Sequence, residues 1–202
     1  MFTKAIIKKP CPSLIDGITS ANLGIPIYEK AVAQHTQYAR ILEDLGLSVT
    51  KQEGNNHFPD AVFVEDVALC MDTFAVITKP GAVSRREETL EMEPTIRHFF
   101  KNIERIISPG TLEGGDVMQV DKHFYIGISG RTNEEGARQL LGILKKYGCS
   151  GTTIPLKETL HLKSGVNYLD NNNLLICGEF VNNSIFAKFH RMIVDPEEAY
   201  AA

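Results

Sequence analysis

Residues 65–77 read EDVALCMDTFAVI, in which an acidic pair precedes two short apolar runs that are separated by Asp72. The two runs, residues 66–70 and 74–77, are rich in the branched and aromatic side chains that favour strands. An Asp between such runs is typical of a tight turn. The segment therefore predicts a β-hairpin that begins at a pair of carboxylates.

The same layout occurs twice more along the chain. Residues 116–120 and 124–127 form a second pair of apolar runs, and residues 165–169 and 174–177 form a third. The three turns contain aspartates spaced 49 residues apart, which are Asp72, Asp121 and Asp170. A fixed period of about fifty residues is the signature of a repeated structural unit.

Helical patterns lie between the hairpins. Residues 86–101 and 132–147 space their apolar side chains along one helix face, and Thr132 with Glu135 predicts a capping box at the start of the second helix. Each helix is followed by a short strand, so the repeated unit is ββαβ. The remaining elements that the pattern predicts are strands at 105–107, 152–154, 47–50 and 191–194, a helix at 28–46 and a short helix at 183–189.

The repeats are expected to build a single domain over residues 1–202, because no linker or low-complexity stretch interrupts them. Three such units cannot cover their own ends, and a ring closed on itself would solve that problem. Residues 5–10 (AIIKKP) resemble residues 75–80 (AVITKP), so the first strand looks like the second half of a hairpin. We therefore expect the C-terminal repeat to be missing from this chain, and the strand at residues 4–9 to carry an exposed edge.

Composition excludes several classes of protein. The 202 residues carry 21 basic and 25 acidic side chains, a net charge of -4, which argues against a nucleic-acid partner. No apolar run approaches the 18 residues or more that a membrane span needs. The N-terminus has too short an apolar stretch for a signal peptide, so we expect a cytoplasmic protein without a membrane partner.

The four cysteines are widely spaced and form no C-x-x-C pair, so free thiols are expected rather than disulfides. Cys70 and Cys177 lie in apolar runs, where buried and inert thiols are the usual outcome. No zinc or calcium motif and no phosphate-binding glycine loop is present. We therefore expect neither a metal nor a cofactor.

Polar candidates occur at the same place in each repeat, just before or at the first strand. They are Asp60 with Glu65 and Asp66, then Glu113 and Asp116, then His161. In a ring these positions would converge, and acidic groups beside one histidine suit a cationic substrate such as a guanidinium, with the histidine as acid and base. The alternatives are that the aspartates cap turns and that the histidine is structural.

Two arginines follow the complete hairpins. Arg85 follows the first hairpin and Arg131 follows the second, and arginine is the natural bidentate partner of a carboxylate. Their alternative role is to begin a solvated helix. The long insertion at residues 11–27 is expected to serve as a lid.

Taken together, these motifs resemble the dimethylarginine dimethylaminohydrolase family of the guanidino-group-modifying (amidinotransferase, or pentein) superfamily. The resemblance runs through nearly the whole chain. It is carried by residues 13–20 (SLIDGITS), 58–66 (FPDAVFVED), 84–87 (SRRE), 112–116 (LEGGD), 130–133 (GRTN) and 160–163 (LHLK).

The resemblance implies an α/β fold, a pseudo-symmetric five-bladed ββαβ propeller that is incomplete in this chain. It implies hydrolysis of methylated arginines to citrulline and a methylamine, without a cofactor. Asp60, Glu65 and Asp66 would hold the guanidinium, Glu113 would orient the guanidinium or the histidine, and His161 would protonate the departing amine and activate water. Arg85 and Arg131 would bind the substrate carboxylate, and Ile18 would lie in the lid.

The family's nucleophile is a cysteine near the C-terminus, whose thiolate forms a covalent intermediate. None of the cysteines at positions 11, 70, 149 and 177 matches that motif. The chain is therefore expected to lack the nucleophile and to be inactive alone. The alternatives are a non-catalytic binder of arginine-like ligands and an arginine deiminase, and a homodimer is left open.

Overall fold

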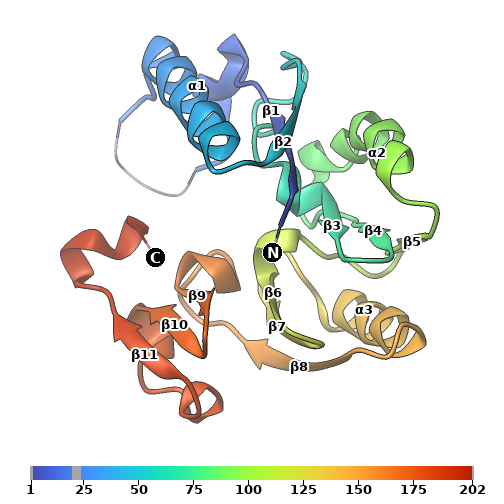
Figure 1. Ribbon diagram of the computed structural model, residues 1–202, viewed down its shortest axis with the longest axis vertical. Helices are drawn as coiled ribbons and strands as arrows, with labels where there is room; N and C mark the ends of the chain where they lie inside the picture. The colour runs from blue at the N-terminus through green and yellow to red at the C-terminus, as the bar shows by residue number, and fades with distance from the viewer. Residues whose placement is uncertain (1, 20–23, 202) are drawn as a thin grey trace.

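A computed structural model describes residues 2–19 and 24–201 of the chain. Within this part of the chain the strands form four separate sheets, which Figure 1 shows arranged around a centre, each next to its neighbour in sequence. Strands β1 (Lys4–Lys8) and β2 (Ser48–Gln52) form a parallel pair. The other sheets are three-stranded, built from β3 (Ala68–Cys70), β4 (Ala75–Ile77) and β5 (Ile103–Arg105), then β6 (Val117–Val120), β7 (His123–Ile128) and β8 (Ser150–Pro155), then β9 (Val166–Asp170), β10 (Asn173–Ile176) and β11 (His190–Ile193).

The three-stranded sheets share one topology, which confirms the predicted repeat. In each of them the first two strands are antiparallel and the third strand is parallel to the middle one. A parallel return requires a crossover, which helix α2 (Glu88–Phe99) supplies in the second sheet and α3 (Glu134–Lys146) in the third. In the fourth sheet a 3₁₀ turn at Ser184–Phe186 replaces the short helix predicted at 183–189.

Two of the predicted hairpin turns need residues that tolerate a left-handed backbone. Asp121 has φ 53°, and Asp170 begins a run of three such residues with φ 83°, 50° and 63°. Asp and Asn adopt this conformation more readily than other residues with a Cβ, because their short side chains hydrogen-bond locally. The acidic and amide residues in these turns are therefore explained by backbone geometry.

The helices lie where the sequence predicts them, but one cap differs. Helix α1 covers Tyr28–Asp44 and packs beside the first sheet. Helix α3 begins after Asn133, whose side-chain oxygen accepts a hydrogen bond from the Gly136 backbone N–H at 2.7 Å. The capping box predicted at Thr132 is therefore wrong. The Thr132 hydroxyl instead accepts the backbone N–H of Glu113 at 3.1 Å.

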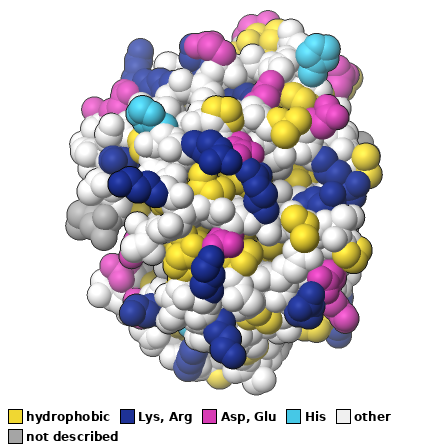
Figure 2. All heavy atoms as spheres, turned by 90° about the vertical axis from the view of Figure 1, so that its right-hand side faces the viewer, with side chains coloured by type: hydrophobic (Ala, Val, Ile, Leu, Met, Phe, Trp, Pro, Cys, Tyr) yellow, Lys and Arg dark blue, Asp and Glu magenta, His cyan; other side chains and the backbone are white. Residues whose placement is uncertain are grey.

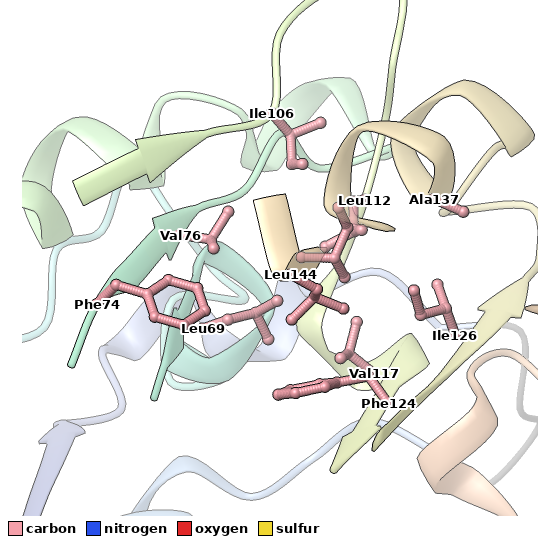
Figure 3. Packing of buried hydrophobic residues seen from close by; sticks show 11 residues of the cluster. Leu69, Phe74, Val76, Ile106, Leu112, Val117, Phe124, Ile126, Ala137 and Leu144 are labelled. Carbon is pink, nitrogen blue, oxygen red and sulfur yellow. The ribbon is translucent and has the colours of Figure 1, made fainter. Parts of the chain in front are cut away.

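Strands β4 and β7 are buried on both faces, which explains their nearly continuous apolar sequences. In β4, Val76 faces the cluster drawn in Figure 3, whereas Ala75 and Ile77 face a second cluster against α2. Successive side chains of a strand point to opposite faces, so one strand serves two cores. In the same way Phe124 of β7 belongs to the cluster of Figure 3 and its neighbour Tyr125 packs against the fourth sheet.

Helices α2 and α3 therefore each lie between their own sheet and the preceding one. The cluster of Figure 3 joins α3 to the second and third sheets, with Leu140 and Leu144 fully buried. Helix α1 comes before the second sheet in the chain. It has one buried residue, Ala39, and Tyr38, Ile41 and Leu45 beside it are exposed. The described sheets form no closed ring, so the five-bladed propeller and the missing repeat stay predictions.

The surface on the side of α2 and α3 mixes the two signs of charge. Figure 2 shows basic and acidic groups interspersed there, and ion pairs such as Arg97–Glu93 at 2.6 Å and Lys146–Glu104 at 2.5 Å lie on it. No helix in the described part of the chain is both long and apolar enough to span a membrane. Part of the predicted lid, residues 20–23, lies outside the described residues.

The prediction for one of the two cysteines in apolar runs is wrong. Cys177 is buried, but Cys70 is exposed. Cys70 is the last residue of the edge strand β3, where the apolar run in the sequence continues into a turn instead of into the core.

Candidate active site

Three short 3₁₀ turns bring the polar candidates together. They cover Val64–Val67, Gly114–Asp116 and Leu162–Ser164, and each lies just before the first strand of a three-stranded sheet. The middle turn contacts both of the others. All eight residues predicted for the site line one cavity of about 560 Å³, namely Ile18, Asp60, Glu65, Asp66, Arg85, Glu113, Arg131 and His161.

The centre of the cavity wall is a carboxylate and imidazole pair. Glu113 is fully buried, and its Oε2 atom lies 2.8 Å from Nε2 of His161, whose side chain is 13% exposed. The second carboxylate oxygen, Oε1, accepts the Ala82 backbone N–H at 3.1 Å and lies 3.6 Å from Nη1 of Arg131. Glu113 therefore contacts both the candidate acid–base residue and a candidate substrate-binding arginine.

The environment favours the charged forms of this pair. Burial works against ionisation of His161, but the hydrogen bond to Glu113 and the negative charges of Asp66 and Asp116 outweigh it and raise the pKa of His161. Burial likewise opposes ionisation of Glu113, but the His161 and Ala82 hydrogen bonds and the Arg131 charge lower the pKa of Glu113. A protonated imidazole with a raised pKa is suited to donate a proton near neutral pH.

Arg85 is held by protein groups on most sides. Its Nη1 atom lies 2.5 Å from Oδ2 of Asp66, its Nε and Nη2 atoms donate to Glu88, and Nη2 also donates to the backbone carbonyls of Asp60 and Phe63. Burial disfavours the charged guanidinium, but the pairs with Glu88 and Asp66 raise the pKa of Arg85 further. Arg85 thus fixes the acidic wall of the cavity from inside the protein.

Asp66 retains capacity for a ligand. Besides Arg85, it accepts the backbone N–H of Gly115 at 2.9 Å through Oδ1. A carboxylate has about four acceptor positions, so two known partners leave room for a further donor from the cavity.

Glu65, the neighbour of Asp66, differs from it. Its side chain is 63% exposed at the cavity mouth, where it pairs with Lys163. Of this acidic pair only Asp66 is buried, because adjacent residues of a 3₁₀ turn point in different directions.

Asp60 anchors the segment that was predicted to act as a lid. Both of its carboxylate oxygens accept the Ile18 backbone N–H, at 3.0 and 3.3 Å. Burial raises the pKa of Asp60, while the Ile18 hydrogen bond and the charges of Arg85 and Arg131 oppose that rise. The Ile18 side chain is exposed and lies at the cavity, so the described part of the insertion borders the site.

Two glycines allow the turns to approach this closely. A Cβ atom on Gly115 would lie 2.8 Å from Cγ of His161, and one on Gly114 would lie 2.1 Å from the Glu65 carbonyl oxygen. Neither position has room for a side chain, because the imidazole and the first turn pack directly against the backbone. Gly115 was visible in the sequence only as part of a turn motif, and nothing there indicated its contact with His161.

Other contributing residues were also not predicted for the site. Glu88 is buried and accepts hydrogen bonds from Arg85, and the Thr132 hydroxyl accepts the Glu113 N–H. Lys163 forms an ion pair with Glu65. Glu88 lies three residues after Arg85, a spacing that brings side chains together at the start of a helix and could have indicated the pair.

Asp66, Glu113 and His161 place one ligand atom each within 4.8 Å of the others, a spacing that would suit a cation. The two carboxylates are already paired with Arg85, Arg131 and His161, so we do not assign these three residues as metal ligands. No cysteine is among the residues that line the cavity in the described part of the chain.

Comparison with known proteins points to one family. The model of the family described as N,N dimethylarginine dimethylhydrolase, eukaryotic, matches residues 23–193. N(G),N(G)-dimethylarginine dimethylaminohydrolase of Pseudomonas aeruginosa is 49% identical over 203 aligned positions, which cover 100% of this chain and 80% of that protein.

Solved structures agree with this relationship. A cysteine-to-serine variant of the Pseudomonas aeruginosa enzyme in complex with citrulline superposes with a TM-score of 0.97 at 48% identity, covering 99% of this chain and 79% of that one. An amidinotransferase from Microseira wollei shares the fold with a TM-score of 0.76 at 15% identity, over 96% of this chain and 73% of that one.

Proposed function

Because the chain belongs to the dimethylarginine dimethylaminohydrolase family of the amidinotransferase superfamily, we propose that its cavity binds an N-omega-methylated arginine for hydrolysis to citrulline and a methylamine. The observation that carries this proposal is the buried Glu113–His161 pair at 2.8 Å, which shares its cavity with Asp66 and Arg131. A guanidinium needs carboxylate partners, and its breakdown needs a proton donor for the departing amine.

The two ends of the substrate have different partners in this arrangement. The free acceptor positions of Asp66, together with Glu113 and Glu65, receive the guanidinium N–H groups. Arg131 takes the substrate carboxylate, since it is bound to the protein through fewer contacts than Arg85. Asp60 holds the Ile18 segment beside the bound amino acid.

The reaction proceeds through a covalent step in this proposal. A thiolate attacks the guanidinium carbon, the bond from that carbon to the methylated nitrogen breaks, and His161 gives its proton to the departing amine. Water then attacks the same carbon, and His161 takes one of its protons. The carbon–sulfur bond breaks to release the thiolate, and the second proton of the water passes to solvent as the carbonyl of citrulline forms.

The attacking thiol is none of the four cysteines in residues 1–202. None of them lines the described cavity, and burial raises the pKa of the Cys177 thiol, which makes it a poor nucleophile. We place the thiol in a segment outside these residues. The five-bladed ring belongs to the same proposal, since an additional unit beside β1 would carry that segment to the cavity.

Binding and turnover test different parts of the proposal. Calorimetry on the 202-residue chain should show binding of citrulline and of asymmetric dimethylarginine without release of dimethylamine. Arg131→Ala should weaken citrulline binding by at least about tenfold, because a charged hydrogen-bonded pair contributes roughly 1.5–3 kcal/mol. Arg138→Ala is the matched control, because Arg138 is exposed on α3 and pairs only with Glu135 among its described contacts.

Protein expressed from the complete gene should form citrulline and dimethylamine in equal amounts. His161→Gln should reduce that rate by about 10²-fold or more, the usual size of a general acid–base contribution. If the product of the complete gene forms no citrulline, the proposed function is wrong. If the 202-residue chain alone forms citrulline, the placement of the thiol is wrong.

A further inference from the structure

Asp116 is a fully buried carboxylate at the end of the middle 3₁₀ turn. Its Oδ1 atom accepts the backbone N–H of Leu162 at 3.0 Å, and its Oδ2 atom accepts the hydroxyl of Ser129 at 2.6 Å. Burial raises the pKa of Asp116, and the Ser129 and Thr132 side chains oppose that rise. An unpaired carboxylate in the interior would be costly, so the donors from Leu162 and Ser129 explain how Asp116 is tolerated.

Each of these bonds fixes a segment that carries a site residue. Leu162 directly follows His161, so its bond to Asp116 sets the backbone from which the imidazole projects. Ser129, while donating to Asp116, accepts the backbone N–H of Arg131 at 3.0 Å. Ser129 also accepts the backbone N–H of Thr132 at 3.1 Å, and the Thr132 hydroxyl accepts the backbone N–H of Glu113. The carboxylate thus connects the backbones of all three residues at the centre of the cavity.

A simple capping role does not account for this side chain. The turn at Asp116 is closed by its backbone N–H, which donates to the Glu113 carbonyl at 3.0 Å, while its side-chain partners are 13 to 46 residues away. The opposite strand leaves room for the carboxylate, because a Cβ atom on Gly127 would lie 2.7 Å from Oδ1.

The preceding repeat contains the same device. Asp66 occupies the equivalent position, and its Oδ1 atom accepts the backbone N–H of Gly115 in the next turn. Both aspartates therefore join one site turn to the following one. The third repeat has Gly165 at this position, so it has no side chain that could bind the backbone of a following turn.

We propose that Asp116 is a positioning residue that holds His161 and Arg131 in register on either side of Glu113. The role deepens the proposed function and rests on it for the identity of the ligand, but the geometry that it predicts is a property of the unliganded protein. Asp116 lines no part of the cavity and would not touch substrate.

Asp116 acts on His161 through its negative charge as well as through its hydrogen bonds. The negative groups facing the imidazole are Glu113, Asp66 and Asp116, and the positive groups around them are Arg85 and Arg131, with Lys163 on the His161 turn itself. Removing the Asp116 charge should lower the pKa of His161. Removing only the Ser129 hydroxyl keeps the carboxylate but takes away one hydrogen bond that favours its charged form.

Two variants of the 202-residue chain separate these effects. Asp116→Asn removes the charge and the acceptor that faces Ser129. Ser129→Ala removes the donor to Asp116 and the acceptor of the Arg131 and Thr132 backbone N–H groups, but it keeps the carboxylate and its bond to Leu162. The His161 ring titration is followed by NMR, with His161→Gln used for assignment, and the exchange rate of the Leu162 amide is followed in parallel. Citrulline affinity is measured by calorimetry.

The expected results differ between the two variants. Asp116→Asn should lower the pKa of His161, speed exchange at Leu162 and weaken citrulline binding by at least about tenfold, since small misplacements of binding groups have effects of this order. Ser129→Ala should weaken citrulline binding and shift the His161 titration less than Asp116→Asn does, because the carboxylate and its bond to Leu162 remain. If Asp116→Asn does not fold, Ser129→Ala decides the question: weaker citrulline binding with an unchanged Leu162 exchange rate supports the role, and unchanged citrulline binding overturns it.

Two controls exclude general effects. Asp121→Asn changes an exposed aspartate whose left-handed backbone Asn tolerates, and it should alter none of the readouts. Leu144→Ala destabilises the distant core of Figure 3. If Leu144→Ala, matched for lost stability, changes the His161 titration or the citrulline affinity as much as Asp116→Asn does, Asp116 is merely structural and the proposal is overturned.

The result does not depend on the proposed function being correct. If the unaltered chain binds neither citrulline nor dimethylarginine, the proposed function loses its support. The His161 titration and the Leu162 exchange rate still test whether Asp116 positions the imidazole, and unchanged values of both in Asp116→Asn would overturn that role.

Discussion

At the scale of the residue, the Glu113–His161 pair links the site to the stability of the protein. The pKa of His161 is raised above 6.5, so its contribution to stability is fully present below pH 6.5 and is lost as the pH rises through the folded-state value. The pKa of Glu113 is lowered below 4.5, so its contribution is present above pH 4.5 and is lost as the pH falls through the folded-state value. Both contributions are complete between these two limits.

Glu113→Gln should therefore destabilise the protein most between pH 4.5 and 6.5, by roughly 1.5–3 kcal/mol for the loss of a charged hydrogen bond. The difference in the free energy of unfolding from the unaltered protein should shrink towards about pH 9. Urea unfolding at several pH values measures it. Glu135→Gln, a control on α3 whose side chain is 29% exposed, should show a difference that stays constant from about pH 5 to 9. A Glu113→Gln effect that grows with pH would contradict the assignment.

The sequence could identify the site residues but not all of their partners. The positions of Glu113 and His161 in the repeat were sufficient to predict that they meet. Arg85 was expected to bind a ligand carboxylate, yet its donors face Glu88 and Asp66, because the start of α2 turns the guanidinium towards the protein. Such choices depend on directions of side chains that spacing alone does not contain.

At the scale of the element, the start of α3 depends on Asn133. Its side-chain oxygen accepts the backbone N–H groups of Gly136 and Thr111, and its amide nitrogen donates to the Pro109 carbonyl at 3.0 Å. A Cβ atom on Gly136 would lie 1.9 Å from the Thr111 carbonyl oxygen, so the helix end is pressed against that segment. One side chain therefore caps the helix and attaches it to the preceding loop.

Asn133→Ala should lower the free energy of unfolding by about 1–3 kcal/mol, since it removes a cap and leaves further polar groups without a partner. Asn133→Asp keeps the acceptor oxygens and loses only the donor to Pro109, so it should recover most of that loss. Urea unfolding of the two variants measures the difference. Equal stability of Asn133→Ala and the unaltered protein would contradict this role of the cap.

The position of each helix was predictable from its apolar spacing, whereas its first residue was not. Thr132 and Asn133 are both good capping residues, and Glu135 favoured Thr132. In the structure Thr132 has a different role. Its buried hydroxyl accepts the backbone N–H of Glu113, and its side chain favours the charged form of Asp116. A tertiary contact thus moved the cap by one residue, which local patterns could not reveal.

At the scale of the whole molecule, burial is unequal along the chain. Strands β4 and β7 are covered on both faces, with Val76 and Ile126 completely buried. Strand β1 pairs only with β2 among the described strands, and all four residues of β11 are exposed. Backbone amides should therefore exchange with solvent slowly in β4 and β7 and at least about tenfold faster in β11 and at the open edge of β1.

Hydrogen exchange followed by mass spectrometry or NMR measures this gradient in the 202-residue chain. Lys4–Lys8 test it most directly, because alternate amides of β1 face β2 and the open edge. Uniform protection of all five amides in a proven monomer would contradict the open edge. The repeat in the sequence made the open edge of β1 predictable.

The placement of α2 and α3 between successive sheets also bears on how the chain reaches its native state. Most of the core contacts join units that are neighbours in sequence, so their formation requires loops of about one repeat rather than of the whole chain. We expect the contacts around α3 to form first and the outer sheets to add on either side, as in other stacked repeat proteins. A substitution in the cluster of Figure 3 would then slow the folding rate, and one in β1 or β11 would chiefly speed unfolding.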